Sequence, residues 1–170
     1  MKFLVTIKSA LPVAIGVLAL GLGSTSIFAA TVTTTFQVTA DVQATCTISV
    51  GAMNFGNYTG TGTGEFGING NMTVTCSNGV SYNIGLNAGL GPGATVTSRA
   101  MTGPGSAVLN YGLFQDSSFT TNWGNTPGVD TVSRTGQGGP QFIVVFGGIP
   151  LGQFVAPGAY ADTITATVTF

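Results

Sequence analysis

The chain has 170 residues, of which only 5% are charged, 27 are glycine and none is histidine. Both lysines, Lys2 and Lys8, lie at the N-terminus, so the remainder carries two arginines against five acids, a net charge of 2 − 5 = −3. This composition disfavours binding to nucleic acid or anionic lipid, because no basic patch can form. Without histidine, and without lysine in the mature chain, the usual general bases of an enzyme are also missing.

The first residues, 1–29, have the layout of a secretory signal peptide. Two lysines form a positive start, residues 10–22 are almost wholly apolar, and small residues lead to Ala29 and Ala30. We expect cleavage after Ala29. A membrane anchor is the alternative, but the apolar run is short and interrupted by glycine. The mature chain, residues 30–170, is therefore expected to be exported, with no membrane insertion after cleavage.

The most regular pattern in the mature chain covers residues 32–50. Apolar or small residues occupy the even positions and polar residues the odd ones, which predicts a strand with one buried face. Such a strand would span about 60 Å at roughly 3.3 Å per residue, which is too long for one domain to bury. We expect residues 42–50 to pack in this domain and residues 31–41 to need another apolar surface.

Further short strands are predicted along the chain, with no helical periodicity between them. A Ser-Asn-Gly sequence at 77–79 predicts a hairpin turn, residues 60–70 a loop or weak edge, and residues 147–159 a loop. Eight or nine strands with such turns indicate a β-sandwich. The predicted strands lie at residues 53–58, 71–77, 80–87, 94–101, 107–114, 129–134, 141–146 and 160–170.

The two cysteines, Cys46 and Cys76, are expected to form a disulfide bond. An exported chain meets an oxidising compartment, where a cysteine pair is normally bonded. A metal site or a catalytic thiol is disfavoured, because the chain has no histidine and no Cys-x-x-Cys motif.

The N-terminal segment and the C-terminal strand of the mature chain could complement each other between two molecules. The C-terminal strand alternates up to Phe170, and a sandwich that ends there could leave an apolar groove open, which is an aggregation hazard. The surplus segment 31–41 of a neighbouring molecule could cover that groove by β-strand addition. The alternatives are that this segment folds back onto its own domain or stays without structure, and the pattern alone does not choose between them.

Several short segments, in this order and spacing, resemble the spore coat protein U domain family, which includes pilins of archaic chaperone–usher pili. They lie at residues 36–47 (FQVTADVQATCT), 55–58 (FGNY), 74–76 (VTC), 111–116 (YGLFQD), 123–124 (WG) and 158–163 (GAYADT). The resemblance implies an all-β, incomplete immunoglobulin-like sandwich that lacks its last strand. It also implies a periplasmic chaperone that lends a strand, and an outer-membrane usher at which the next subunit's N-terminal segment replaces it.

Carried onto this chain, the resemblance assigns residues 30–42 to a donor-strand extension and residues 43–170 to the pilin domain. The implied function is a secreted structural subunit of a surface fibre, built from identical or related subunits and supporting adhesion or biofilm formation. A coat protein of the same fold is the alternative within the family. The resemblance implies a Cys46–Cys76 disulfide, donor residues Val32, Phe36, Val38 and Ala40, and groove residues Ile164, Ala166, Val168 and Phe170.

Other candidate sites are weaker, and we expect no enzyme activity, cofactor or metal. An aromatic platform of Trp123, Tyr58 and Tyr111 could bind sugar, which keeps a secreted carbohydrate-binding module as a second hypothesis, although core or loop packing is the preferred interpretation. Arg99 and Arg134 are expected to pair with acids at the surface. Asp162 is expected to bond backbone or threonine groups near the final strand.

Overall fold

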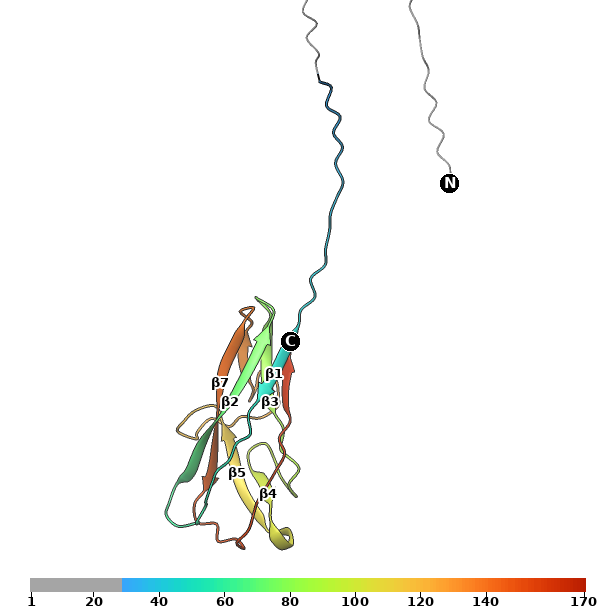
Figure 1. Cartoon of the computed structure of the whole chain (residues 1–170). Helices are drawn as coiled ribbons and strands as arrows, with labels where there is room; N and C mark the ends of the chain where they lie inside the picture. Colours follow the sequence, from blue (N-terminus) through green and yellow to red (C-terminus); the bar gives the residue numbers. More distant parts are fainter. Residues whose placement is uncertain (1–28) are drawn as a thin grey trace, which may run out of the picture. The chain divides into compact units, whose positions relative to one another are not determined.

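The computed structural model describes residues 29–170 (Figure 1). The predicted signal peptide, apart from Ala29, lies outside these described residues. The chain divides into two compact units, Met1–Ala40 and Asp41–Phe170. In the described part of the first unit and in the following residues 41–45, no regular secondary structure forms and every residue is exposed. No helix among the described residues is long and apolar enough to cross a membrane.

The second unit is an all-β sandwich, as predicted, with eight strands in two antiparallel sheets (Figure 1). The larger sheet has the order β1-β2-β7-β5-β4, and the smaller has the order β6-β3-β8. A short 3-10 turn, Pro104–Ser106, precedes β5. The strands are β1 Cys46–Val50, β2 Glu65–Cys76, β3 Ser81–Leu86, β4 Arg99–Thr102, β5 Val108–Phe114, β6 Val132–Thr135, β7 Pro140–Pro150 and β8 Ala166–Thr169.

The core forms where the inward faces of the two sheets meet. Strand β2 contributes Met72, Val74 and Cys76, which alternate with outward threonines and are at most 1% exposed. The indole of Trp123 is fully buried and donates a hydrogen bond to the Ile84 carbonyl at 2.8 Å. The predicted two-residue alternation therefore sets which side chains enter the core.

The disulfide joins the first two strands of the larger sheet. Cys46 of β1 lies directly opposite Cys76 of β2, with a Cα–Cα distance of 4.1 Å, and the two sulfur atoms are bonded. β1 is an edge strand that pairs only with β2 among the described residues. The covalent link therefore reinforces the main-chain pairing at this edge of the sheet.

The prediction of a loop at residues 147–150 was wrong, because these residues are the end of β7. Residues 65–70, predicted as a loop or weak edge, are the first half of β2, and they lie at an edge because β1 pairs with β2 only from Met72 to Cys76. These two stretches pair with each other, from Glu65 opposite Pro150 to Ile68 opposite Gly147. Their glycines lower the intrinsic preference for a strand, but pairing with a neighbour outweighs local propensity.

The predicted hairpin at residues 77–79 is also wrong. The chain does turn there, with a hydrogen bond from Val80 N to Ser77 O at 3.2 Å and a φ of 80° at Gly79. The flanking strands β2 and β3, however, belong to different sheets. The turn therefore carries the chain across the sandwich, because β3 pairs with β6 and β8 rather than with β2.

Arg99 does not pair at the surface, contrary to the prediction. It is fully buried, and its guanidinium donates hydrogen bonds of 2.7–3.0 Å to main-chain carbonyls. Burial lowers the pKa of Arg99 from its usual value. The other arginine, Arg134, is exposed and donates a hydrogen bond to the neighbouring Ser133 carbonyl at 3.3 Å. The carbonyls that Arg99 binds belong to Leu86, Asn87, Val96 and Trp123.

Candidate functional site

An open groove runs along one side of the sandwich, where the edges of the two sheets approach each other. One wall is the chain from Ile48 to Thr59, and the other is the chain from Gln153 to Ala166. Two adjoining cavities of about 640 and 890 Å³ make up the groove, and Met53, Met101 and Tyr160 border both of them. The walls run in opposite directions, since Ile48 and Ala166 line one cavity while Thr59 and Gln153 line the other.

The floor of the groove is the core itself. Met72, Leu113 and Val145 underlie the cavity next to β1 and β8, and Leu109 and Ile149 underlie the other. No charged side chain lines the larger cavity, and Asp162 is the one charged residue that lines the smaller. A groove of this chemistry suits apolar side chains that arrive on an extended backbone.

The N-terminal wall loses its main-chain support halfway along. β1 pairs with β2 up to Val50, and Gly51 N donates to Asn71 O at 3.1 Å. Residues 52–59 then make no main-chain hydrogen bonds to other main-chain groups in the described chain. The prediction of a strand at residues 53–58 was therefore wrong. The physical reason is that a strand needs a hydrogen-bonded partner beside it, and this stretch has none.

Side chains hold this unpaired wall in place. The Met53 side chain packs directly against the backbone of two glycines, Gly70 and Gly147. A Cβ atom added to Gly70 would lie 2.6 Å from the Met53 Cγ, and one added to Gly147 would lie 2.8 Å from the Met53 Cε. Phe55 packs edge-on against Tyr111, with ring centroids 6.1 Å apart. The thioether of Met53 can change shape easily, which suits a cavity that must fit a second chain.

The C-terminal wall is tied firmly to the domain. Ala161 exchanges two main-chain hydrogen bonds with Thr102, of 2.9 and 3.2 Å. Asp162 accepts hydrogen bonds from Leu90 N at 2.7 Å, from the Tyr111 hydroxyl at 2.8 Å and from Thr163 N at 2.7 Å. Burial, together with the bond to Asp162, raises the pKa of Tyr111 above its usual value, so this hydroxyl keeps its proton. The wall is thus fixed along one side.

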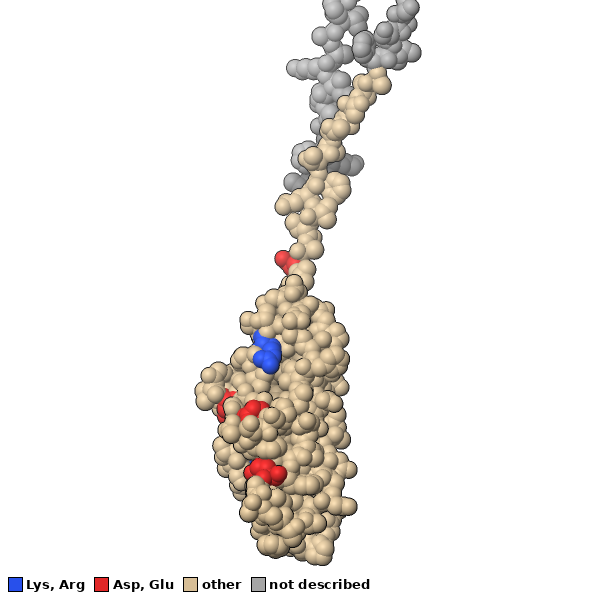
Figure 2. Space-filling view, turned by 90° about the vertical axis from the view of Figure 1, so that its left-hand side faces the viewer, with Lys and Arg blue, Asp and Glu red and all other residues tan. Residues whose placement is uncertain are grey.

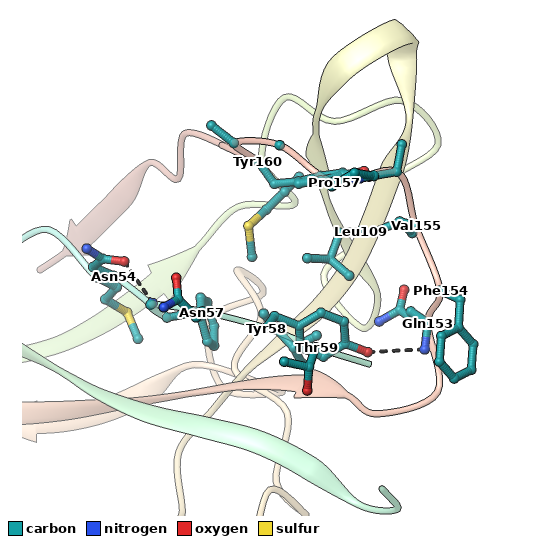
Figure 3. Close-up of a pocket in the computed structure, with 18 residues that line it drawn as sticks. Asn54, Asn57, Tyr58, Thr59, Leu109, Gln153, Phe154, Val155, Pro157 and Tyr160 are labelled. Atoms are coloured by element: carbon teal, nitrogen blue, oxygen red, sulfur yellow. Dashed lines mark hydrogen bonds between the residues drawn. The ribbon is translucent and has the colours of Figure 1, made fainter. Parts of the chain in front are cut away.

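The far end of the groove is preformed by a polar network, of which Figure 3 shows the bond between Tyr58 and Gln153. The Tyr58 hydroxyl donates to the Pro150 carbonyl at 2.8 Å and accepts from Gln153 N at 3.1 Å. The Gln153 side chain bonds both main-chain groups of Asn110, at 2.8 and 2.9 Å. These bonds join the two walls to β5 and β7 at this end.

The predicted groove residues fall into two groups. Ile164 and Ala166 line the smaller cavity. Val168 is half-buried and packs on the core beyond it, and Phe170 is 57% exposed and borders neither cavity. The opposite wall was not assigned from the sequence. The sequence signal for this wall is the aromatic stretch at residues 53–58. Its composition is that of a strand, although the structure gives it no main-chain partner among the described residues.

The predicted donor residues are exposed. Val32, Phe36 and Val38 are 94%, 86% and 80% exposed, and Ala40 is also exposed.

The aromatic platform of the carbohydrate-binding hypothesis does not form. Trp123 and Tyr111 are buried, and Tyr58 is half-buried with its hydroxyl engaged at the groove. Stacking on a sugar needs exposed ring faces, which these three residues do not offer together.

The sequence matches the Spore Coat Protein U domain over residues 32–167. A similar protein is Protein U of Myxococcus xanthus, which is 34% identical over 157 residues, covering 84% of this chain and 87% of that protein.

A solved structure with a similar fold is the CsuC–CsuE chaperone–tip adhesion subunit pre-assembly complex from the archaic chaperone-usher Csu pili of Acinetobacter baumannii. The matched chain is 28% identical, with a TM-score of 0.57. The alignment covers 76% of this chain and 40% of the matched chain, so the likeness spans less than half of the latter.

Proposed function

Because the chain belongs to the Spore Coat Protein U domain family, we propose that it is a structural subunit of a surface fibre that polymerises by strand exchange. The observation that carries this proposal is an apolar groove in a domain whose chain also holds an unpaired, alternating apolar segment. The segment of one molecule, residues 30–42, fills the groove of the next. The subunit is structural and not an enzyme.

The lengths of the groove and the segment agree. The N-terminal wall from Ile48 to Thr59 corresponds to about 40 Å of extended chain, and residues 32–42 to about 36 Å, at roughly 3.3 Å per residue. Val32, Phe36, Val38 and Ala40 then face the floor, where each exchanges water for apolar neighbours. The backbone of the incoming strand supplies partners for the unpaired wall at residues 52–59.

A groove of this size needs a cover before assembly, because exposed apolar surface and unpaired edges lead to aggregation. We place a periplasmic chaperone in this role, and the similar Csu structure, a chaperone–subunit pre-assembly complex, supports the choice. An outer-membrane usher then exchanges the chaperone strand for the next subunit's extension. This route begins with removal of residues 1–29 and ends at a cell-surface fibre that serves adhesion or biofilm formation.

A coat layer is the second candidate, and the description of the family as a spore coat domain favours it. Strand exchange between subunits could also build such a layer. Electron microscopy of cells that express the chain separates the two, because fibres extend from the cell whereas a layer follows its surface.

The decisive experiment is deletion of residues 30–41 in cells that also supply the chaperone and the usher. The deletion leaves every residue of the groove and both cysteines, so we expect a folded subunit in complex with the chaperone but no polymer. Chaperone binding is measured by co-purification, and polymerisation by electron microscopy and boiling-resistant ladders on gels. Fibres of normal length from the deleted chain would refute strand exchange.

A further inference from the structure

The C-terminal wall of the groove carries a row of threonines on its outward face. Thr163, Thr165, Thr167 and Thr169 are exposed, whereas the residues between them are half-buried against the core. β8 pairs with β3 along one edge, and its other edge has no hydrogen-bonded strand beside it within residues 29–170. An unpaired edge of this kind is a template for another strand.

The opposite wall and the N-terminal extension share this chemistry. In β1, Thr47 and Ser49 point outward and are exposed, whereas Ile48 is half-buried. In the extension, the even positions are apolar except for Thr34, and the odd positions are Thr31, Thr33, Thr35, Gln37, Thr39 and Asp41. Side chains alternate along a strand, so an extension whose even positions enter the groove must turn its odd positions outward, between two rows of hydroxyl groups.

Charge offers little means of selecting the strand that enters the groove. Asp41 is the one charged residue of the extension. Asp162 is the one charged residue lining the two cavities, and its carboxylate is already engaged by Tyr111 and Leu90. The face of the molecule in Figure 2 likewise carries few charged groups. Complementary charge therefore contributes little to the choice between partner strands. The outward uncharged side chains are left as the source of that selectivity.

We propose that the strand in the groove comes from a second copy of this chain, and that its outward threonines pair across the strands with those of the C-terminal wall. This inference rests on the proposed function and adds the identity of the partner. Threonine pairs directly opposite each other on neighbouring strands are favourable contacts. Every pair of neighbouring strands in both sheets is antiparallel. An incoming strand that runs antiparallel to β8, with Val32 beside Ala166, brings Thr33 opposite Thr165.

Charge substitutions at this pair test both the contact and the partner. In a fibre made of one kind of chain, every joint contains the extension of one copy and the wall of the next. We therefore expect the Thr33→Glu/Thr165→Lys chain to form fibres at close to the normal rate. The Thr33→Glu/Thr165→Glu chain should assemble about 2- to 5-fold more slowly, because like charges lie opposite each other. Light scattering of purified, chaperone-released subunits measures the rate.

Thr135 provides a matched control, because it is exposed on β6, which is separated from β8 by β3. Chains that combine Thr33→Glu with Thr135→Lys or with Thr135→Glu should assemble at the same rate as each other. If a lysine at position 165 prevents folding, the reversed pair, Thr33→Lys/Thr165→Glu, tests the same contact.

The outcomes separate this inference from the proposed function. Equal rates for unlike and like charges at position 165, repeated with position 163 and position 167, would overturn the threonine pairing. Failure of the unsubstituted chain to polymerise would instead overturn the fibre itself. Fibres that form only when a different subunit is added would overturn the claim that the partner is a second copy.

Discussion

At the scale of single residues, the proposed fibre explains the exposure of the large apolar side chains of the extension, although not that of Phe142 or Phe154. Phe36 and Val38 are 86% and 80% exposed in the single chain, and the proposed fibre buries both. Gln37 lies between them and turns the other way, so it provides a control that differs only in the direction of its side chain. The three positions therefore form a compact test of the assigned register.

We expect Phe36→Asp and Val38→Asp each to reduce fibre yield at least tenfold, because an unpaired carboxylate would enter an apolar groove. Gln37→Asp should keep most of the yield, since its carboxylate stays in water. Quantified gel ladders of the polymers measure this difference. Equal losses for all three variants would mean that charge alone, and not the register, disturbs assembly.

Arg99 stabilises the domain from inside. Its guanidinium satisfies carbonyls that arrive from three separate parts of the chain, around residues 86–87, 96 and 123. Replacing it by methionine keeps most of the volume but leaves several buried acceptors unpaired, at about 1–3 kcal/mol each.

We therefore expect Arg99→Met to lower the free energy of unfolding by more than about 3 kcal/mol, measured by urea denaturation of the purified chain. Arg134→Met is the control and should change it by less than about 0.5 kcal/mol, because Arg134 is exposed. If both variants lose similar amounts of stability, the carbonyl network is not what holds these loops.

At the scale of elements, the two walls of the groove are built differently. The C-terminal wall is fixed by β8, by the Ala161–Thr102 pair and by Asp162. The N-terminal wall is held by a short edge strand, by the disulfide and by the side chains of residues 53–58. A wall without main-chain partners can adjust to an incoming strand, whereas a fixed wall can define its register.

Removing the disulfide tests this division. Cys46→Ser/Cys76→Ser should lower the free energy of unfolding by roughly 3–4 kcal/mol, the value expected for a link across a sequence separation of this size. Hydrogen exchange should rise first in β1 and in residues 72–76 of β2, because the link holds the pairing of these two stretches. A uniform rise across both walls would contradict the view that the disulfide serves mainly the N-terminal wall.

At the scale of the whole molecule, the domain is a sandwich with a gap in its covering. The core residues under the groove are ordinary apolar side chains, but one row of them lacks a strand above it. Residues 30–42, which are exposed and form no strand, are the proposed source of such a strand. Filling the gap from another copy, as proposed, would bury both surfaces together, so assembly and completion of the core would be the same event.

The fold class and the inward faces of several strands could be predicted from the sequence. Strict alternation predicted the all-β class and the inward faces of β2, β3 and β5, because the two-residue period is a local property of extended chain. The length of the alternation at residues 32–50 separated a surplus segment from the domain, since no domain of this size can bury so long a strand. The sparse charge and the lack of histidine also disfavour nucleic-acid binding and catalysis, and these stay predictions.

The tertiary structure alone decided which segments lie beside each other. It paired residues 65–68 with residues 147–150, left residues 53–58 without a partner, and buried Arg99 among loops far apart in sequence. It also joined Tyr58 to Gln153 at the end of the groove. The reason is physical: strand partners and buried polar contacts depend on which distant segments meet, and a local pattern of side chains specifies a face but not its neighbour.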